Sequence, residues 1–148
     1  MACVVLTSKR AGRALPGSRH SDAAGYSNAG NARCAADIDI YIGNDAEILP
    51  TLALGGKGVI STMGNIAPGD ISNIVEKFMA GDLEGSRKLQ LGILPIIRLL
   101  FADVNPMPVK AALRMMGFDM GQCRLPLVDI EEELRAALQQ EMKRYSLI

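Results

Sequence analysis

Polar and apolar residues alternate where the ordered pattern of this chain begins, through Asp37-Ile38-Asp39-Ile40-Tyr41-Ile42. Alternation with a period of two is typical of a strand that buries one face. The run Gly43-Asn44-Asp45 follows at once and consists of turn-forming residues. The pattern predicts a strand over about 38–42.

A second strand is predicted over about 58–62, in the run Gly55-Gly56-Lys57-Gly58-Val59-Ile60-Ser61. The β-branched pair Val59 and Ile60 suits a strand that is covered on both faces. A helix over 46–54, capped by Asn44 or Asp45, separates the two strands and ends at the glycines. Strand, helix and strand in this order predict a βαβ unit with parallel strands and a right-handed crossover.

Helical periodicity dominates the remainder of the chain. The first helix follows a turn with Asp70 as capping acid and ends at Gly81, and its apolar positions are Ile71, Ile74, Val75, Phe78 and Met79. A longer helix, capped by Asp82, runs to about residue 102 with apolar positions Leu89, Ile93, Ile96, Ile97 and Leu100, and Gly92 and Pro95 should bend it.

Two more helices follow a rigid break at Asn105-Pro106-Met107-Pro108. One is predicted over 109–116 and stops at Gly117. The last is predicted over about 130–144, with Asp129 as its cap, glutamates in its first turn and basic residues in its last, which matches the helix dipole. Four helices therefore follow only two strands.

Composition narrows the class of protein. A chain of 148 residues with 49% hydrophobic content can bury one core, and its 16 basic and 16 acidic residues give a formal net charge of zero. Zero net charge argues against a nucleic-acid or membrane-surface partner, and no apolar run is long enough to cross a bilayer. The three cysteines, widely spaced, support neither a zinc site nor a disulfide framework, so we expect no metal and a reduced, cytoplasmic setting.

Residues 1–36 differ from the rest because five basic residues stand there against the single acid Asp22, without periodicity. We interpret this leader as disordered. The apolar run Ala2 to Leu6 is too short for a secretory signal, and an organelle transit peptide, which is also rich in arginine and poor in acids, is the alternative.

Candidate reactive residues are few. Lys57 and Lys110 are the lysines nearest apolar surroundings, but Lys57 precedes its strand and Lys110 starts a helix, so we expect both to be solvated rather than to form a Schiff base. His20 is the only histidine and lies in the leader, which excludes a confident catalytic triad. Gly55-Gly56-Lys57-Gly58 precedes a strand and not a helix, so it is a turn and not a phosphate loop.

Four motifs in order resemble the carboxyl half of the dihydrodipicolinate synthase and N-acetylneuraminate lyase family. They are Ile42-Gly43-Asn44-Asp45, Leu54 to Ser61, Asn65-Ile66-Ala67-Pro68 and Asn105-Pro106-Met107-Pro108-Val109-Lys110. The resemblance covers about residues 37–148. With Arg124-Leu125-Pro126-Leu127, it is nearest to the branch that condenses pyruvate with aspartate semialdehyde in lysine biosynthesis.

The resemblance implies an α/β fold: the last two strands of a (β/α)8 TIM barrel with their helices over 37–81, then a C-terminal helical domain over 82–148. Family members form a Schiff base between pyruvate and a lysine on the sixth strand, a segment that this chain does not match. The resemblance therefore implies no catalytic residue and no cofactor here, and carries over only Gly43 and Ile60 as walls of the pyruvate pocket.

From these residues we expect a truncated aldolase-type lyase that is inactive alone. An open sheet edge and an uncovered apolar face favour a homo-oligomer or pairing with a missing amino half. The alternative is a non-catalytic interaction module that binds a full-length relative. A frameshift upstream of the Asp37 codon is one hypothesis for the leader, and the DNA sequence there tests it.

Overall fold

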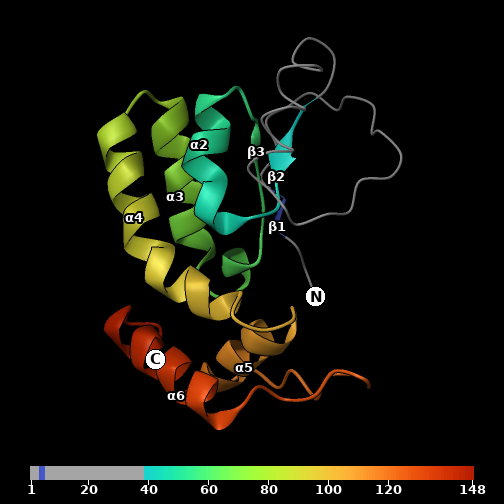
Figure 1. Cartoon of the computed structure of the whole chain (residues 1–148). Helices are drawn as coiled ribbons and strands as arrows, with labels where there is room; N and C mark the ends of the chain where they lie inside the picture. Colours follow the sequence, from blue (N-terminus) through green and yellow to red (C-terminus); the bar gives the residue numbers. More distant parts are fainter. Residues whose placement is uncertain (1–3, 6–38) are drawn as a thin grey trace.

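The computed structural model describes residues 4–5 and 39–148 of the chain. Three short strands, β1 (Val4–Val5), β2 (Tyr41–Ile42) and β3 (Gly58–Ser61), form a sheet in the order β1-β3-β2 (Figure 1). β2 runs parallel to β3, with Tyr41 opposite Gly58 and Ile42 opposite Val59. The predicted parallel pairing is therefore confirmed, although β2 is shorter than the 38–42 expected.

The prediction that the whole leader lacks regular structure is wrong at β1. Its two residues pair antiparallel to β3, with Val4 opposite Ser61 and Val5 opposite Ile60. Two valines form a pattern too short to predict a strand by itself, because pairing with a neighbour decides such a short segment. The remainder of the leader, including His20, Cys3 and Cys34, lies outside the described residues.

A short helical segment connects the two parallel strands, as predicted. It begins as the 3-10 turn η1 (Asp45–Glu47), where the Asn44 side chain accepts a hydrogen bond from Ala46 N, and continues as α2 (Ile48–Ala53). Gly55 ends it with a φ of 95°, a left-handed conformation that glycine adopts without strain.

Two antiparallel helices, α3 (Pro68–Met79) and α4 (Leu83–Leu100), pack against one another. The Asp82 carboxylate caps α4 by accepting from Gly85 N at 2.9 Å, as predicted. Asp70 is not a cap, because Ala67 occupies that position and Asp70 accepts a hydrogen bond from Tyr145 instead. Met79, predicted on the buried face of α3, is the last residue of that helix and is 52% exposed.

Helices α5 (Met107–Met115) and α6 (Glu132–Arg144) pack below α4 in Figure 1. α5 begins two residues before the predicted start, since proline is accommodated in the first turn of a helix. Asp129 does not cap α6. It pairs with Arg114 of α5 and approaches Arg135 of α6, so its charge links two helices.

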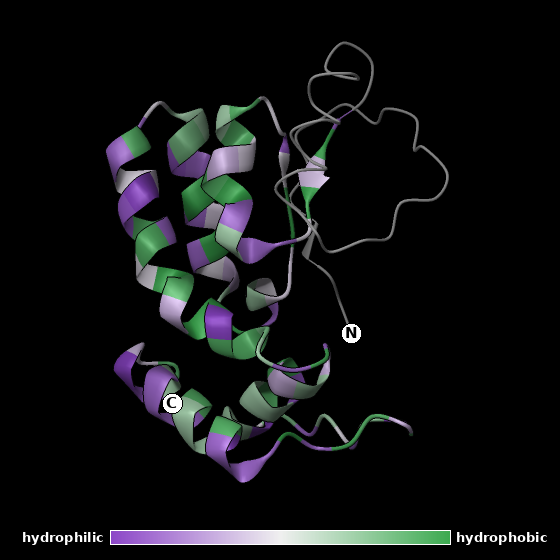
Figure 2. Ribbon diagram, viewed as in Figure 1, coloured by the Kyte–Doolittle hydropathy of each residue, from purple (hydrophilic) through white to green (hydrophobic). Residues whose placement is uncertain are grey.

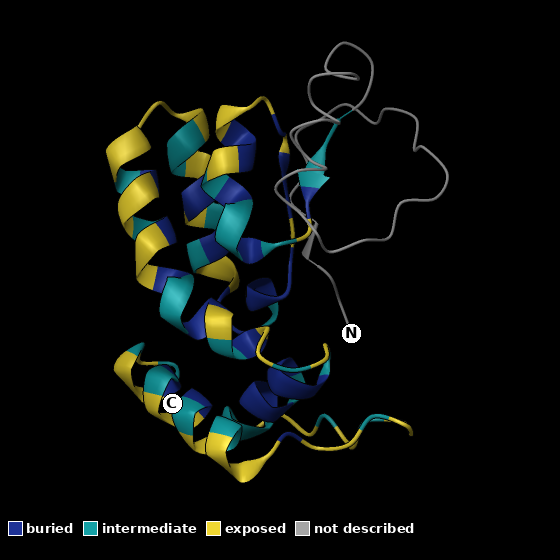
Figure 3. Cartoon of the chain, in the orientation of Figure 1, coloured by how far each residue is buried: buried dark blue, intermediate teal, exposed yellow. Residues whose placement is uncertain are grey.

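The core lies between the sheet and the helices and continues between α4, α5 and α6. Apolar residues line the facing sides of the helices, while their outer sides are polar and exposed (Figures 2 and 3). η2 (Met63–Asn65), a 3-10 turn after β3, inserts Met63 into this core with no exposed surface. Within the described residues, no helix combines the length and the apolar character needed to span a membrane.

Candidate functional site

The carboxyl ends of β2 and β3 lie side by side, because the two strands are parallel neighbours. Gly43, Asn44 and Asp45 follow β2, while Thr62 and the η2 turn follow β3. In α/β proteins this edge of a parallel sheet carries the binding and catalytic residues. The parallel pairing that the sequence predicts thus brings the segments after the two strands together at one edge of the sheet.

The buried carboxylate of Asp45 joins the two strand ends. Its Oδ2 atom accepts hydrogen bonds from Thr62 N at 3.0 Å and Met63 N at 2.8 Å. The side chain has no exposed surface. Asp45, which the sequence suggested only as a helix cap, therefore fixes the segment after β3 against the segment after β2.

Burial dominates the electrostatics of this carboxyl group. Removal from water raises the pKa of Asp45 above its ordinary value, while the nearby Ser61 hydroxyl and the N–H groups of Met63 and Thr62 lower it by less. The Ser61 hydroxyl also accepts a hydrogen bond from Gly64 N at 2.7 Å. The Oδ1 atom has no hydrogen-bond partner among the described residues.

Two polar side chains reach the strand ends from the helical region. Gln90 of α4 donates from Nε2 to the Asp45 carbonyl at 2.9 Å and accepts from Leu49 N through Oε1 at 3.2 Å. Asn105, in the connection between α4 and α5, donates from Nδ2 to Thr62 Oγ1 at 3.2 Å. We call these four residues, Asp45, Thr62, Gln90 and Asn105, the strand-end junction.

Gln90 was not among the residues predicted from the sequence, although a signal for it was present. Gln90 stands three and seven positions before Ile93 and Ile97, so it lies on the apolar face of the predicted helix. It is only 4% exposed. A polar residue on a buried face needs hydrogen-bond partners, and the backbone groups of Asp45 and Leu49 supply them.

Gly43 and Ile60, the two predicted pocket residues, share one property: the described part of the chain leaves space beside them. A Cβ atom added to Gly43 would meet no heavy atom within 4 Å. Ile60 is 40% exposed, whereas its neighbours Val59 and Ser61 are fully buried. Alternation along β3 therefore directs Ile60 to the face of the sheet opposite the helices, against the prediction of a strand covered on both faces.

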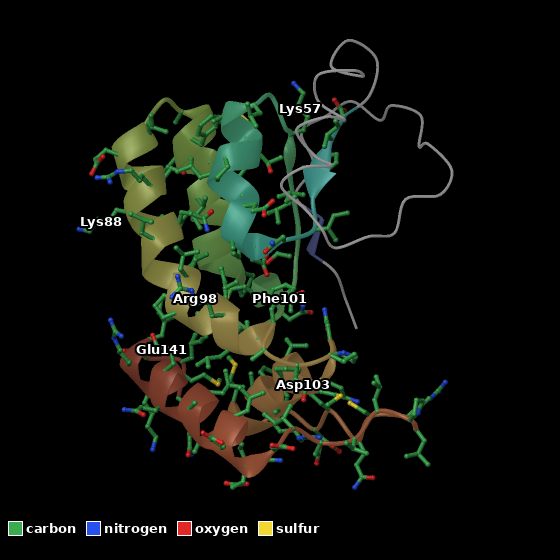
Figure 4. The ribbon with its side chains drawn as sticks, in the orientation of Figure 1. Lys57, Lys88, Arg98, Phe101, Asp103 and Glu141 are labelled. Atoms are coloured by element: carbon green, nitrogen blue, oxygen red, sulfur yellow. The ribbon has the colours of Figure 1, made fainter. Side chains whose placement is uncertain are left out.

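Neither candidate lysine lies at the carboxyl ends of β2 and β3. Lys57 is exposed at the amino end of β3, and Figure 4 shows it at the opposite end of the strand from η2. Lys110 donates from Nζ to the Gln122 carbonyl at 2.9 Å. Both positions agree with the expectation that these two lysines are ordinary surface residues.

A hollow of about 410 Å³ lies elsewhere, between the end of α4 and the start of α6. Its lining includes the carboxylates of Asp103, Glu131 and Glu133. Across residues 39–148, no group of three or more histidine, cysteine or acidic side chains is arranged to hold a metal ion. The hollow and the strand ends are thus separate features.

Comparison with known proteins identifies 4-hydroxy-tetrahydrodipicolinate synthases among the relatives of this chain. The chain is 50% identical over 115 residues to 4-hydroxy-tetrahydrodipicolinate synthase of Acetivibrio thermocellus and 49% identical over 115 residues to that of Lachnoclostridium phytofermentans. Each match covers 78% of this chain and 39% of the relative. The chain therefore spans about two fifths of the length of these curated relatives.

Solved structures give the same result for the fold. A dihydrodipicolinate synthase from Cyanidioschyzon merolae, crystallised with lysine bound, matches with a TM-score of 0.80 at 33% identity, over 86% of this chain and 44% of that one. The Thermotoga maritima enzyme matches with a TM-score of 0.75 at 37% identity, over 80% and 40%. The fold described above thus corresponds to part of a TIM-barrel enzyme. Because the model of the dihydrodipicolinate synthetase family matches residues 22–145, this chain belongs to that family.

Proposed function

We propose that this chain supplies the pyruvate-pocket wall and the C-terminal helical domain of a lyase of the 4-hydroxy-tetrahydrodipicolinate synthase type. The observation that carries the proposal is the 50% identity to such a synthase over 115 residues, a segment that includes both strand ends. The boundaries that we assign are residues 37–81 for the barrel portion and 82–148 for the helical domain.

Gly43 and Ile60 form the pocket wall in this proposal. The open space beside Gly43 would admit a small ligand or a neighbouring strand, and the partly exposed Ile60 would give that ligand an apolar surface. Neither residue carries a reactive group. Their role is to position pyruvate and to exclude water, which strengthens electrostatic interactions in a site.

The chain is inactive alone in this proposal because neither candidate lysine in its described part is a suitable amine. In the reaction of the family, a lysine Nζ attacks the ketone of pyruvate, water leaves, and an imine forms. A lysine becomes nucleophilic at neutral pH when burial lowers the pKa of its ammonium group. Lys57 is exposed and the Lys110 ammonium is hydrogen-bonded to a carbonyl, so neither meets this requirement.

An interaction module is the second candidate, favoured by the exposed face of the sheet. Ile60 presents apolar surface on a strand whose other face is buried. In the full barrel of the relatives such a face would be covered by the remaining strands. The chain would then bind a full-length relative without adding chemistry. Failure to co-purify with an intact synthase would exclude this candidate.

The test of the leading proposal supplies the missing amino half. We would mix the chain with a separately produced amino half of the Acetivibrio thermocellus synthase, add pyruvate and borohydride, and measure the mass of each polypeptide. We expect the amino half to gain the mass of one borohydride-reduced pyruvate adduct, and only when this chain is present. Equal trapping with and without the chain, or no trapping at all, would contradict the proposal.

A further inference from the structure

The helical domain makes two side-chain hydrogen bonds to the strand ends, one to each strand. Gln90 of α4 holds the Asp45 backbone after β2, and Asn105 holds the Thr62 hydroxyl after β3. The Asp45 carboxylate then closes the connection by accepting from Thr62 N. The strand-end junction is therefore a closed set of contacts, in which each member fixes the next.

The contacts that complete the junction are buried or partly buried, which makes them costly to lose. Gln90 is 4% and Thr62 is 8% exposed, while Asp45 has no exposed surface. A buried N–H or carbonyl group that loses its partner retains the full cost of its removal from water. The junction therefore holds the two strand ends against one another, most strongly at Asp45 and Gln90, since Asn105 is itself exposed.

We propose that Gln90 and Asn105 are positioning residues, through which the helical domain sets the geometry of the pyruvate-pocket wall. Gly43 stands two residues before Asp45, and Ile60 stands two residues before Thr62. Any shift of the junction therefore moves both wall residues. The inference rests on the proposed function, but it assigns a role to residues outside the barrel strands, none of which needs to touch pyruvate.

Backbone amide exchange tests the junction in the chain alone. Gln90→Met keeps the volume of the side chain but removes both hydrogen bonds, so we expect the Leu49 amide, which donates to Gln90, to exchange roughly tenfold faster. Asn105→Ala should accelerate exchange at Thr62 by about threefold. Unchanged exchange at both amides would show that the junction does not hold the strand ends. Equal acceleration at a distant amide, such as that of Ile96, would show that the variants loosen the whole fold instead.

Matched variants separate the junction from general effects of substitution. Gln139→Ala and Asn73→Ala remove the same side-chain types from exposed positions and should leave the exchange of Leu49 and Thr62 unchanged. At Thr62, serine retains the hydroxyl that accepts from Asn105, whereas valine does not. We therefore expect Thr62→Ser to behave like the natural chain and Thr62→Val to behave like Asn105→Ala.

Pyruvate trapping in the mixture with the amino half tests the positioning role. We expect Gln90→Met and Asn105→Ala to raise the pyruvate concentration that gives half-maximal trapping by about threefold or more, while the exposed-site control Asn73→Ala leaves it unchanged. An unchanged concentration, with normal trapping by the natural chain, would overturn only the positioning role. Absence of trapping by the natural chain would instead contradict the proposed function, and the exchange results would still decide the junction.

Discussion

The strand-end region and the helical domain differ in how completely this chain covers their apolar surface and pairs their charged groups. In the helical domain, α4, α5 and α6 enclose a filled core, and the charged side chains form surface pairs such as Arg87 with Glu84. At the strand ends, one face of β3 is exposed at Ile60, and Asp45 and Glu47 each bury a carboxylate oxygen that has no hydrogen-bond partner within residues 39–148. The strand ends, where we propose that the substrate binds, are thus the region that other segments would cover.

The largest expected effect compares two isoleucines, one from each region. Ile96 of α4 has no exposed surface, so Ile96→Ala should lower the free energy of unfolding by about 2–5 kcal/mol through lost burial and a cavity. Ile60→Ala, at a 40% exposed position, should cost about 1 kcal/mol or less. Urea denaturation measures both. Equal losses would show that a full cover already lies over Ile60 in solution.

Two glycines give the next comparison. A Cβ atom at Gly56 would stand 2.6 Å from Thr51 Cγ2 and 2.8 Å from the Thr51 carbonyl oxygen, so Gly56→Ala should destabilise the chain by about 1–3 kcal/mol. Gly43→Ala meets no such obstacle and should change the free energy of unfolding little in the chain alone. In the mixture with the amino half, however, it should reduce pyruvate trapping. A stable Gly43→Ala chain that traps normally would remove Gly43 from the pocket wall.

The smallest effect concerns the contact between α6 and α3. Tyr145 donates from its hydroxyl to Asp70 Oδ2 at 3.1 Å, and its burial, followed by the charge and the hydrogen bond of Asp70, raises the pKa of Tyr145 to about 12. A raised pKa means that the folded chain keeps this proton while the unfolded chain loses it near pH 10. This contribution to stability is therefore present below pH 10 and is lost as the pH rises through about 12.

Tyr145→Phe tests that contribution. At neutral pH it should cost about 0.5–1.5 kcal/mol, the net value of one hydrogen bond. The difference in unfolding free energy between the natural chain and Tyr145→Phe should then shrink between pH 10 and 12. A difference that stays constant over this interval would show that Tyr145 titrates alike in the folded and unfolded states.

Local patterns predicted the elements that depend on local chemistry. The helical period located α4 because Ile93, Ile96, Ile97 and Leu100 repeat on one face, and Asp82 caps it because its carboxylate reaches an amide three residues away. Gly55, Gly81 and Gly117 mark chain reversals with positive φ, as their positions indicated.

The remaining features depend on contacts between distant segments. Asp70 and Asp129 have the residue type and spacing of caps, yet each pairs with a residue of another helix. Asp45 has the same appearance in the sequence, but it joins two strands through amides 17 and 18 positions away. A carboxylate near a helix start can satisfy either arrangement, and only the folded chain decides between them.

We propose that this chain carries a pocket wall without a reactive lysine. The decisive experiment treats the chain alone with pyruvate and borohydride and then measures its mass, with the full-length Acetivibrio thermocellus synthase as the positive control. We expect an unchanged mass for this chain and the mass of one reduced pyruvate adduct on the control. A stable adduct on this chain, mapped by fragmentation to Lys57, Lys110 or any other lysine, would contradict it.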